Sequence, residues 1–189
     1  MIRIGILGDI GSGKSYIAKN FGYPVFNADY EVSKLYQKNR KIYKALKKTL
    51  PKYIYKFPIE KTQLSKAILA NSSNLKKIIN IVHKEIRNKM RFFLKKNKNK
   101  KFVILDIPLL LENKINKKKD ILVYVESKKT DILKHLKKRK NLNLEILHKF
   151  KKIQLPLAYK KKNSQFIIKN KFNKKSVRDK IKFILANIK

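Results

Sequence analysis

A short loop near the start of the chain has the residue types and spacing that hold a phosphate. Residues 8–15, GDIGSGKS, match the pattern G-x-x-x-x-G-K-S/T at each defined position. Gly11 and Gly13 can adopt backbone angles closed to other residues, so that successive N–H groups point at one anion. Lys14 can reach the β- and γ-phosphates of a nucleotide, and the Ser15 hydroxyl can coordinate Mg²⁺. The loop therefore predicts binding of ATP or GTP.

The elements on either side of this loop are the ones that it requires. Residues 2–7 form a mostly apolar run that predicts a buried strand, and residues 15–21 predict the first turns of a helix. A glycine-rich turn with a chance lysine is the alternative interpretation. We expect the nucleotide to contact six consecutive residues, namely Gly11, Ser12, Gly13, Lys14, Ser15 and Tyr16.

Carboxylates follow two further predicted strands, residues 23–26 and 102–105. The carboxyl ends of parallel strands form the edge at which α/β sheets bind ligands. Asp29 can there orient an acceptor hydroxyl and take its proton, or it can cap a helix that begins near Glu31. Asp106 can hold Mg²⁺ through water, or it can act as a cap or turn residue.

Strands and helices alternate along the chain, which favours a parallel α/β sheet with right-handed crossovers. Residues 31–97 show only helical patterning, which predicts a helical insertion, and a basic segment follows later. We expect one P-loop NTPase-like kinase domain with a parallel sheet flanked by helices, a helical acceptor-binding insertion and a lid. The expected boundaries are about 1–30, 100–137 and 164–189 for the core, about 31–98 for the acceptor lobe and about 138–163 for the lid.

The formal charge of the 189-residue chain is +38, with lysine supplying 44 of its 50 basic residues. A polyanionic partner such as nucleic acid is one interpretation. Composition bias is the other, because lysine and asparagine, which occurs 17 times, share A-rich codons. The lysines are spread through nearly every segment rather than gathered in one stripe, so we expect no specific nucleic-acid partner. With no cysteine, no leader and no membrane segment in the sequence, we expect a cytoplasmic protein, with a monomer favoured.

The phosphate loop alone does not name a reaction, because many enzyme classes use one. The sequence contains no Asn-Lys-x-Asp for guanine, and the chain is short for a translocating ATPase. An acceptor lobe and a mobile lid suit a small-molecule kinase, in which closure excludes water. Two alternatives remain open: another nucleoside or nucleotide kinase, and a nucleic-acid-binding protein that uses ATP as a switch.

Several short motifs, taken in order, resemble the dephospho-coenzyme A kinases over nearly the whole chain. Besides the loop, they are Asn27-Ala28-Asp29, His83, DIPLLLE at 106–112, QLPL at 154–157 ahead of Lys160, and FIIKN at 166–170. The resemblance implies transfer of a phosphoryl group from ATP, with Mg²⁺, to the ribose 3′-hydroxyl of dephospho-CoA. The products would be CoA and ADP, in the last step of coenzyme A biosynthesis.

The resemblance also implies roles for individual residues. Lys14, Asp29 and Arg139 would be catalytic, and Ser15 and Asp106 would hold the metal. Contacts with dephospho-CoA are expected from Asp29, His83, Pro108, Leu109 and Lys160. From the residues alone, a lone histidine such as His83 is more often a surface or packing residue of its helix than a ligand, and the alternative for Arg139 is a cation at a helix C-terminus.

The chain also departs from the family pattern. Asp9, Tyr16 and Asn27 stand where that pattern usually has glycine, threonine and aspartate, and Lys84 replaces the proline that follows the histidine.

Overall fold

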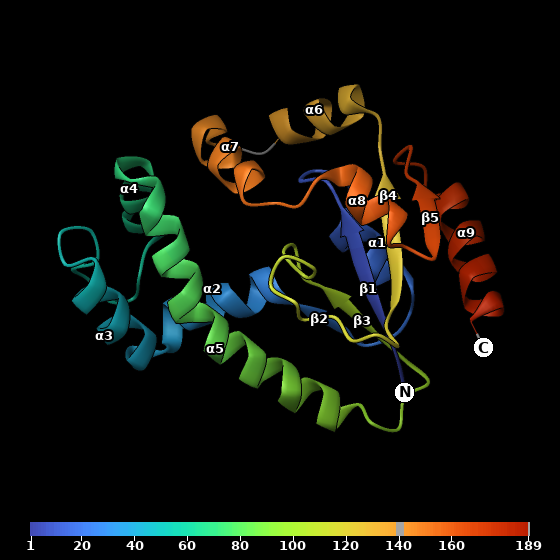
Figure 1. Cartoon of the computed structure of the whole chain (residues 1–189), viewed down its shortest axis with the longest axis horizontal. Helices are drawn as coiled ribbons and strands as arrows, with labels where there is room; N and C mark the ends of the chain where they lie inside the picture. The colour runs from blue at the N-terminus through green and yellow to red at the C-terminus, as the bar shows by residue number, and fades with distance from the viewer. Residues whose placement is uncertain (139–141, 189) are drawn as a thin grey trace. The chain divides into compact units, whose positions relative to one another are not determined.

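The computed structural model, which describes residues 1–138 and 142–188, contains a five-stranded parallel sheet (Figure 1). The strand order is β2-β3-β1-β4-β5, and each neighbouring pair is parallel. The strands are β1 (Ile2–Gly8), β2 (Val25–Asn27), β3 (Phe102–Asp106), β4 (Ile121–Glu126) and β5 (Phe166–Lys169). This sheet confirms the α/β fold with a parallel sheet expected from the sequence.

Helices occupy much of the rest of the described chain. They are α1 (Lys14–Asn20), α2 (Ala28–Lys38), α3 (Arg40–Thr49), α4 (Lys61–Ala70), α5 (Ser72–Lys96), α6 (Lys129–Lys137), α7 (Leu144–Lys152), α8 (Leu157–Lys162) and α9 (Lys174–Asn187). Across the described residues, no helix combines the length and apolar character needed to span a bilayer.

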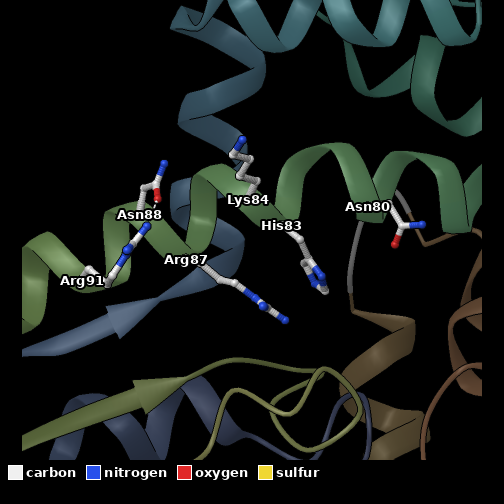
Figure 2. Close-up of a pocket in the computed structure, with 6 residues that line it drawn as sticks. All are labelled: Asn80, His83, Lys84, Arg87, Asn88 and Arg91. Carbon is white, nitrogen blue, oxygen red and sulfur yellow. Dashed lines mark hydrogen bonds between the residues drawn. The ribbon is translucent and has the colours of Figure 1, made fainter.

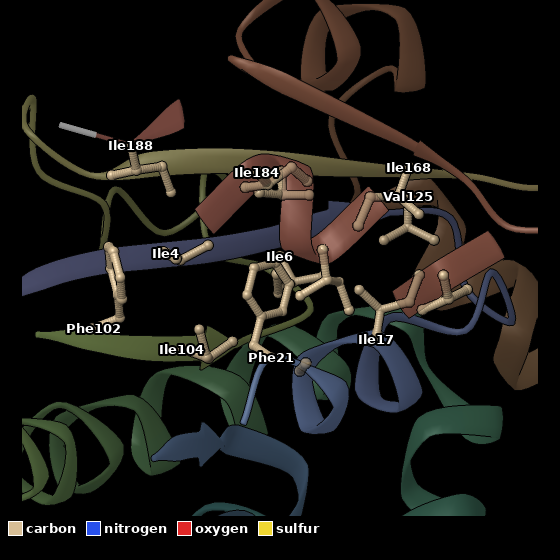
Figure 3. Close-up of a cluster of buried hydrophobic side chains, with 14 residues drawn as sticks. Ile4, Ile6, Ile17, Phe21, Phe102, Ile104, Val125, Ile168, Ile184 and Ile188 are labelled. Atoms are coloured by element: carbon tan, nitrogen blue, oxygen red, sulfur yellow. The ribbon is translucent and has the colours of Figure 1, made fainter. Parts of the chain in front are cut away.

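The hydrophobic core of the sheet lies between the strands and two helices, α1 and α9 (Figure 3). Ile4 and Ile6 of β1 are fully buried, as strands inside a parallel sheet usually are. Ile17 of α1 and Ile184 of α9 pack in the same cluster. Because this packing fixes α1 against β1, the loop that joins them is held at both ends.

The chain contacts divide the protein into two units, each described here by itself. One holds the sheet and comprises Met1–Asn27, Asn97–Leu142 and Ile153–Lys189; the other is helical and comprises Ala28–Lys96 and Asn143–Lys152. In the helical unit, α2, α3 and α4 pack against α5. The helix α5 buries one face, as its three- and four-residue apolar spacing predicts, and that face comprises Leu75, Ile78, Val82, Ile86 and Met90.

The expected lid is divided between these two units. Within the helical unit α7 contacts α4, and Lys149 donates from Nζ to the carbonyls of Ile68 (2.9 Å) and Leu69 (2.8 Å). The helix α8 belongs to the sheet unit, where it contacts β1. Residues 139–141 lie outside the described part of the chain. The division into core, acceptor lobe and lid stays a prediction.

Candidate active site

The phosphate loop runs from the end of β1 to the start of α1. Gly8, Gly11 and Gly13 have φ values of 145°, 88° and 90°, a region that residues with a side chain rarely adopt. The surroundings of Gly13 also exclude a side chain, because a Cβ there would lie 2.4 Å from Nδ2 of Asn170. The glycines of the loop therefore adopt the backbone conformation that their spacing in the sequence predicts.

Ser12, in the middle of the loop, is held from two sides. Its carbonyl accepts hydrogen bonds from Ser127 Oγ (3.0 Å) and from Asn170 Nδ2 (2.9 Å), and its N–H donates to the Asp9 carbonyl (3.2 Å). The Ser12 hydroxyl is buried and has no hydrogen-bond partner among the described residues. These bonds fix the loop before any ligand binds, which lowers the cost of ordering it around a phosphate.

The Lys14 ammonium lies along this loop. Nζ donates to the carbonyls of Gly8 (3.2 Å) and Asp9 (2.7 Å), and the residue is 9% exposed. A cation at this place fits an anionic ligand, because a phosphate oxygen makes a stronger, charge-assisted hydrogen bond than a carbonyl does.

Oxygen ligands suitable for Mg²⁺ lie at the carboxyl edge of the same sheet. Ser15 is an exposed residue in the first turn of α1, and Asp106 ends β3, the strand next to β1. The Asp106 carboxylate is buried and accepts a 2.5 Å hydrogen bond from Asn27 Nδ2. Hydroxyl and carboxylate oxygens are the donors that Mg²⁺ prefers, so these residues fit the ion. Within the described residues, no group of three or more histidine, aspartate or glutamate side chains could hold a metal by itself.

Asp29 lies in the first turn of α2, where its side chain is exposed. The helix begins at Ala28, so Asp29 is inside it and cannot be the N-cap of a helix starting near Glu31, which was the alternative drawn from the sequence. Burial raises the pKa of the Tyr36 hydroxyl, and the negative charge of Asp29 raises it further.

His83 lines a pocket on the side of α5, of about 310 Å³ (Figure 2). The six lining residues all belong to that helix and are Asn80, His83, Lys84, Arg87, Asn88 and Arg91. Burial, and then the positive charge of Arg87, lower the pKa of His83 below its usual value. The pocket is strongly basic, which suits a phosphorylated ligand.

Pro108 and Leu109 are half-buried in the segment that follows β3. Lys160 of α8 is in the interior, 1% exposed, with Nζ 2.6 Å from Oε1 of Glu112. The same carboxylate oxygen accepts a hydrogen bond from the Leu155 N–H (3.0 Å). A phosphate would thus have to compete with Glu112 for the Lys160 ammonium, and the expected substrate contact stays a prediction.

Of the residues expected at the site, the sheet unit contains the loop residues, Tyr16 and Asp106, whereas Asp29 and His83 belong to the helical unit. Tyr16 is exposed on α1. Arg139 lies outside the described residues.

The sequence pattern described as dephospho-CoA kinase matches residues 2–176. The chain belongs to the dephospho-CoA kinase family. A dephospho-CoA kinase of Wolbachia sp. subsp. Brugia malayi (strain TRS) is 38% identical over 127 residues, which cover 65% of this chain and 65% of that protein. The alignment thus spans just under two thirds of the length of this curated relative.

Solved structures agree with the dephospho-CoA kinase fold. TT1252 from Thermus thermophilus superposes with a TM-score of 0.76 at 25% identity, covering 100% of this chain and 98% of that one. A dephospho-CoA kinase from Campylobacter jejuni has a TM-score of 0.61 at 23% identity, covering 97% and 95%. The second likeness concerns the fold alone.

Three residues that position the loop and its acidic neighbour in this dephospho-CoA kinase family member were not identified as such from the sequence. They are Ser127, Asn170 and Asn27, which hold the Ser12 carbonyl and the Asp106 carboxylate. Asn170 follows the last predicted strand, and its place at a strand end was the one available signal. Its contact with Ser12 spans 158 residues, so no local pattern could show it.

Proposed function

We propose that the chain transfers the γ-phosphate of ATP to the ribose 3′-hydroxyl of dephospho-CoA, giving CoA and ADP. The observation that carries this proposal is the phosphate loop fixed through the Ser12 carbonyl, in a chain that belongs to the dephospho-CoA kinase family. Catalysis of this kind consists mainly of positioning and electrostatic stabilisation.

The loop and Lys14 bind the donor. Backbone N–H groups of residues 11–15 surround the phosphates, while the Lys14 ammonium exchanges the Gly8 and Asp9 carbonyls for phosphate oxygens. The charge on Lys14 then stabilises the negative charge that is spread over the transferring group. The Ser12 hydroxyl, buried without a partner among the described residues, is a further donor for a phosphate oxygen.

Ser15 and Asp106 are the proposed ligands of Mg²⁺, and Asp106 would hold the ion through a water molecule. When bound, the ion would neutralise charge on the β- and γ-phosphate oxygens. Asn27 keeps the Asp106 carboxylate in one orientation by donating to it. Chelation of divalent ions should therefore stop transfer, and added Mg²⁺ should restore it.

Asp29 is the proposed partner of the acceptor hydroxyl, which it orients and from which it takes the proton. His83, Pro108, Leu109 and Lys160 are proposed contacts of dephospho-CoA. Arg139, assigned from the sequence alone, is proposed to stabilise phosphoryl charge. We further propose that the protein acts in the cytoplasm as a monomer.

The test is ADP release, followed with a coupled assay, using dephospho-CoA and a panel of nucleosides and nucleotides as acceptors. We expect turnover with dephospho-CoA, with CoA identified as the product by mass spectrometry, and turnover at least about a hundredfold slower with the Lys14→Ala variant. Turnover with a nucleoside alone would assign a different small kinase. Absence of all turnover, together with sequence-selective nucleic-acid binding at physiological salt, would favour an ATP-dependent switch.

A further inference from the structure

An aromatic pair lies on the surface of the sheet unit, outside its core. The rings of His135, in the last turn of α6, and Phe172, between β5 and α9, are stacked with centroids 3.8 Å apart and planes 24° apart. His135 is exposed and Phe172 is partly exposed. Phe172 has a φ of 58°, a left-handed conformation that is unusual for a residue with an aromatic side chain. Such a conformation persists only where its surroundings impose it.

The surroundings that impose it are bonded to the phosphate loop through Asn170. Asn170, which is 2% exposed, accepts a hydrogen bond from the Phe172 N–H (2.9 Å) and donates to the Ser12 carbonyl (2.9 Å). A Cβ built on Gly13 would lie 3.4 Å from Cε1 of Phe172. The Phe172 ring is therefore held directly beside the backbone that binds phosphate.

His135 is tied to the same loop through its helix. A Cβ built on Gly11 would lie 3.0 Å from side-chain atoms of both Ile132 and Leu136 of α6. Both rings of the pair thus come from elements that pack on the loop, one on Gly11 and the other on Gly13. Their position relative to the phosphate site is fixed by packing rather than by the stack itself.

We propose that Phe172, backed by His135, is the platform on which the purine base of ATP stacks. The ribose joins the base of a nucleotide to its α-phosphate, so a nucleotide whose phosphates occupy the loop must place its base near the elements that pack on that loop. Exposed aromatic rings bind bases through their faces, and each such stack strengthens binding measurably. The inference rests on the proposed function only in taking ATP as the phosphoryl donor.

The first experiment uses Phe172→Trp, which keeps an aromatic face and adds the single tryptophan to a chain that has none. We expect ATP to quench the tryptophan emission on binding, because stacking on a purine does so. Inorganic tripolyphosphate, which fills the loop but has no base, should bind with little quenching. Equal quenching by both probes would overturn the proposal, since the ring would then respond to phosphate alone.

The second experiment removes the aromatic face with Phe172→Leu and measures binding of each probe by titration calorimetry. We expect ATP affinity to fall about 5- to 100-fold, the range of one base–aromatic stack, while tripolyphosphate affinity is unchanged. The matched control is Phe183→Leu, which alters a 51% exposed phenylalanine of α9 and should change neither affinity. Unchanged ATP affinity in Phe172→Leu overturns the proposal, and so does an equal loss for both probes, which would mean a distorted loop.

These measurements need no acceptor substrate, so the inference and the proposed function can fail separately. Suppose that Phe172→Leu loses its preference for ATP over tripolyphosphate, while the parent does not phosphorylate dephospho-CoA. The inference about Phe172 would then hold and the proposed function would fail. If Phe172→Leu instead binds ATP as tightly as the parent and the parent makes CoA, the inference about Phe172 would fail and the proposed function would hold. Phe172→Trp should also retain at least most of the parental ATP affinity that Phe172→Leu loses.

Discussion

The Nζ atom of Lys160 lies 2.6 Å from Oε1 of Glu112, and the two side chains are only 1% and 8% exposed. The other Glu112 oxygen is buried without a hydrogen-bond partner among the described residues. Removal of one member of such a pair leaves the other charged group buried and unpaired, which is far more costly than removal of both.

The first prediction follows from this pair. Lys160→Met should lower the free energy of unfolding by about 3–5 kcal/mol, measured by urea denaturation. The double variant Lys160→Met/Glu112→Gln should recover much of that loss, because no buried charge is left unpaired. If Lys160 also contacts substrate, folded Lys160→Met at low temperature should show a raised KM for dephospho-CoA. An unchanged KM would restrict Lys160 to the ion pair.

The second prediction concerns Lys14. Lys14→Ala should lower kcat at least about a hundredfold, because the ammonium stabilises charge in the transition state. The fold should survive, because the hydrophobic core that holds α1 against the sheet does not include Lys14. Activity is followed by ADP release and folding by circular dichroism. Normal turnover in the variant would remove the loop from the reaction.

Asp29 gives the third prediction. Asp29→Asn keeps the shape of the side chain and removes its charge, so transfer should fall by roughly two to four orders of magnitude. Binding of ATP with Mg²⁺ should stay close to parental, because the loop and Lys14 hold the nucleotide. If the variant instead transfers phosphate at the parental rate and only melts earlier, Asp29 serves α2 alone and Asp106 becomes the next carboxylate to test.

The fourth prediction concerns pH. Burial, followed by the charge of Arg87, lowers the pKa of His83 from its usual 6.5, so the folded chain takes up this proton less readily than the unfolded chain. The contribution of His83 to stability is therefore complete above pH 6.5 and is lost as the pH falls through the lower folded value. His83→Gln should gain stability relative to the parent as the pH falls from about 7 to about 5.

The control for this pH experiment is His148→Gln, which alters an exposed histidine of α7. That variant should follow the parental stability curve over the same range. Parallel curves for His83→Gln and the parent would contradict the prediction, because they would mean that His83 takes up its proton equally in both states.

The parts of the structure that the sequence could predict are those whose cause is local. The phosphate loop and the strand that precedes it follow from glycine spacing and a short, mostly apolar run, and the structure has both. The carboxyl-edge position of Asp106 follows in the same way from the strand that precedes it. The start of the second helix was predicted less accurately. The helix α2 begins at Ala28, three residues before the expected Glu31, because the chain passes directly from β2 into the helix.

The parts that could not be predicted depend on contacts between distant residues. Lys160 is one lysine among 44, and its burial depends on Glu112, 48 positions earlier in the chain. The order of the strands is likewise a tertiary property, because each strand is compatible with several neighbours. The aromatic pair was also inaccessible, since His135 and Phe172 are separated by a strand and two helices.

The place of β1 in the sheet affects when the protein can fold during its synthesis. This strand is made first, yet its neighbours β3 and β4 begin at Phe102 and Ile121. Since a chain emerges from the ribosome N-terminus first, the nascent β1 remains unpaired until the residues from Phe102 onward have been translated. Ser127 and Asn170, which fix the Ser12 carbonyl, arrive later still. Nucleotide should therefore bind only to chains that extend at least to Asn170, so that ATP cannot stabilise shorter translation intermediates.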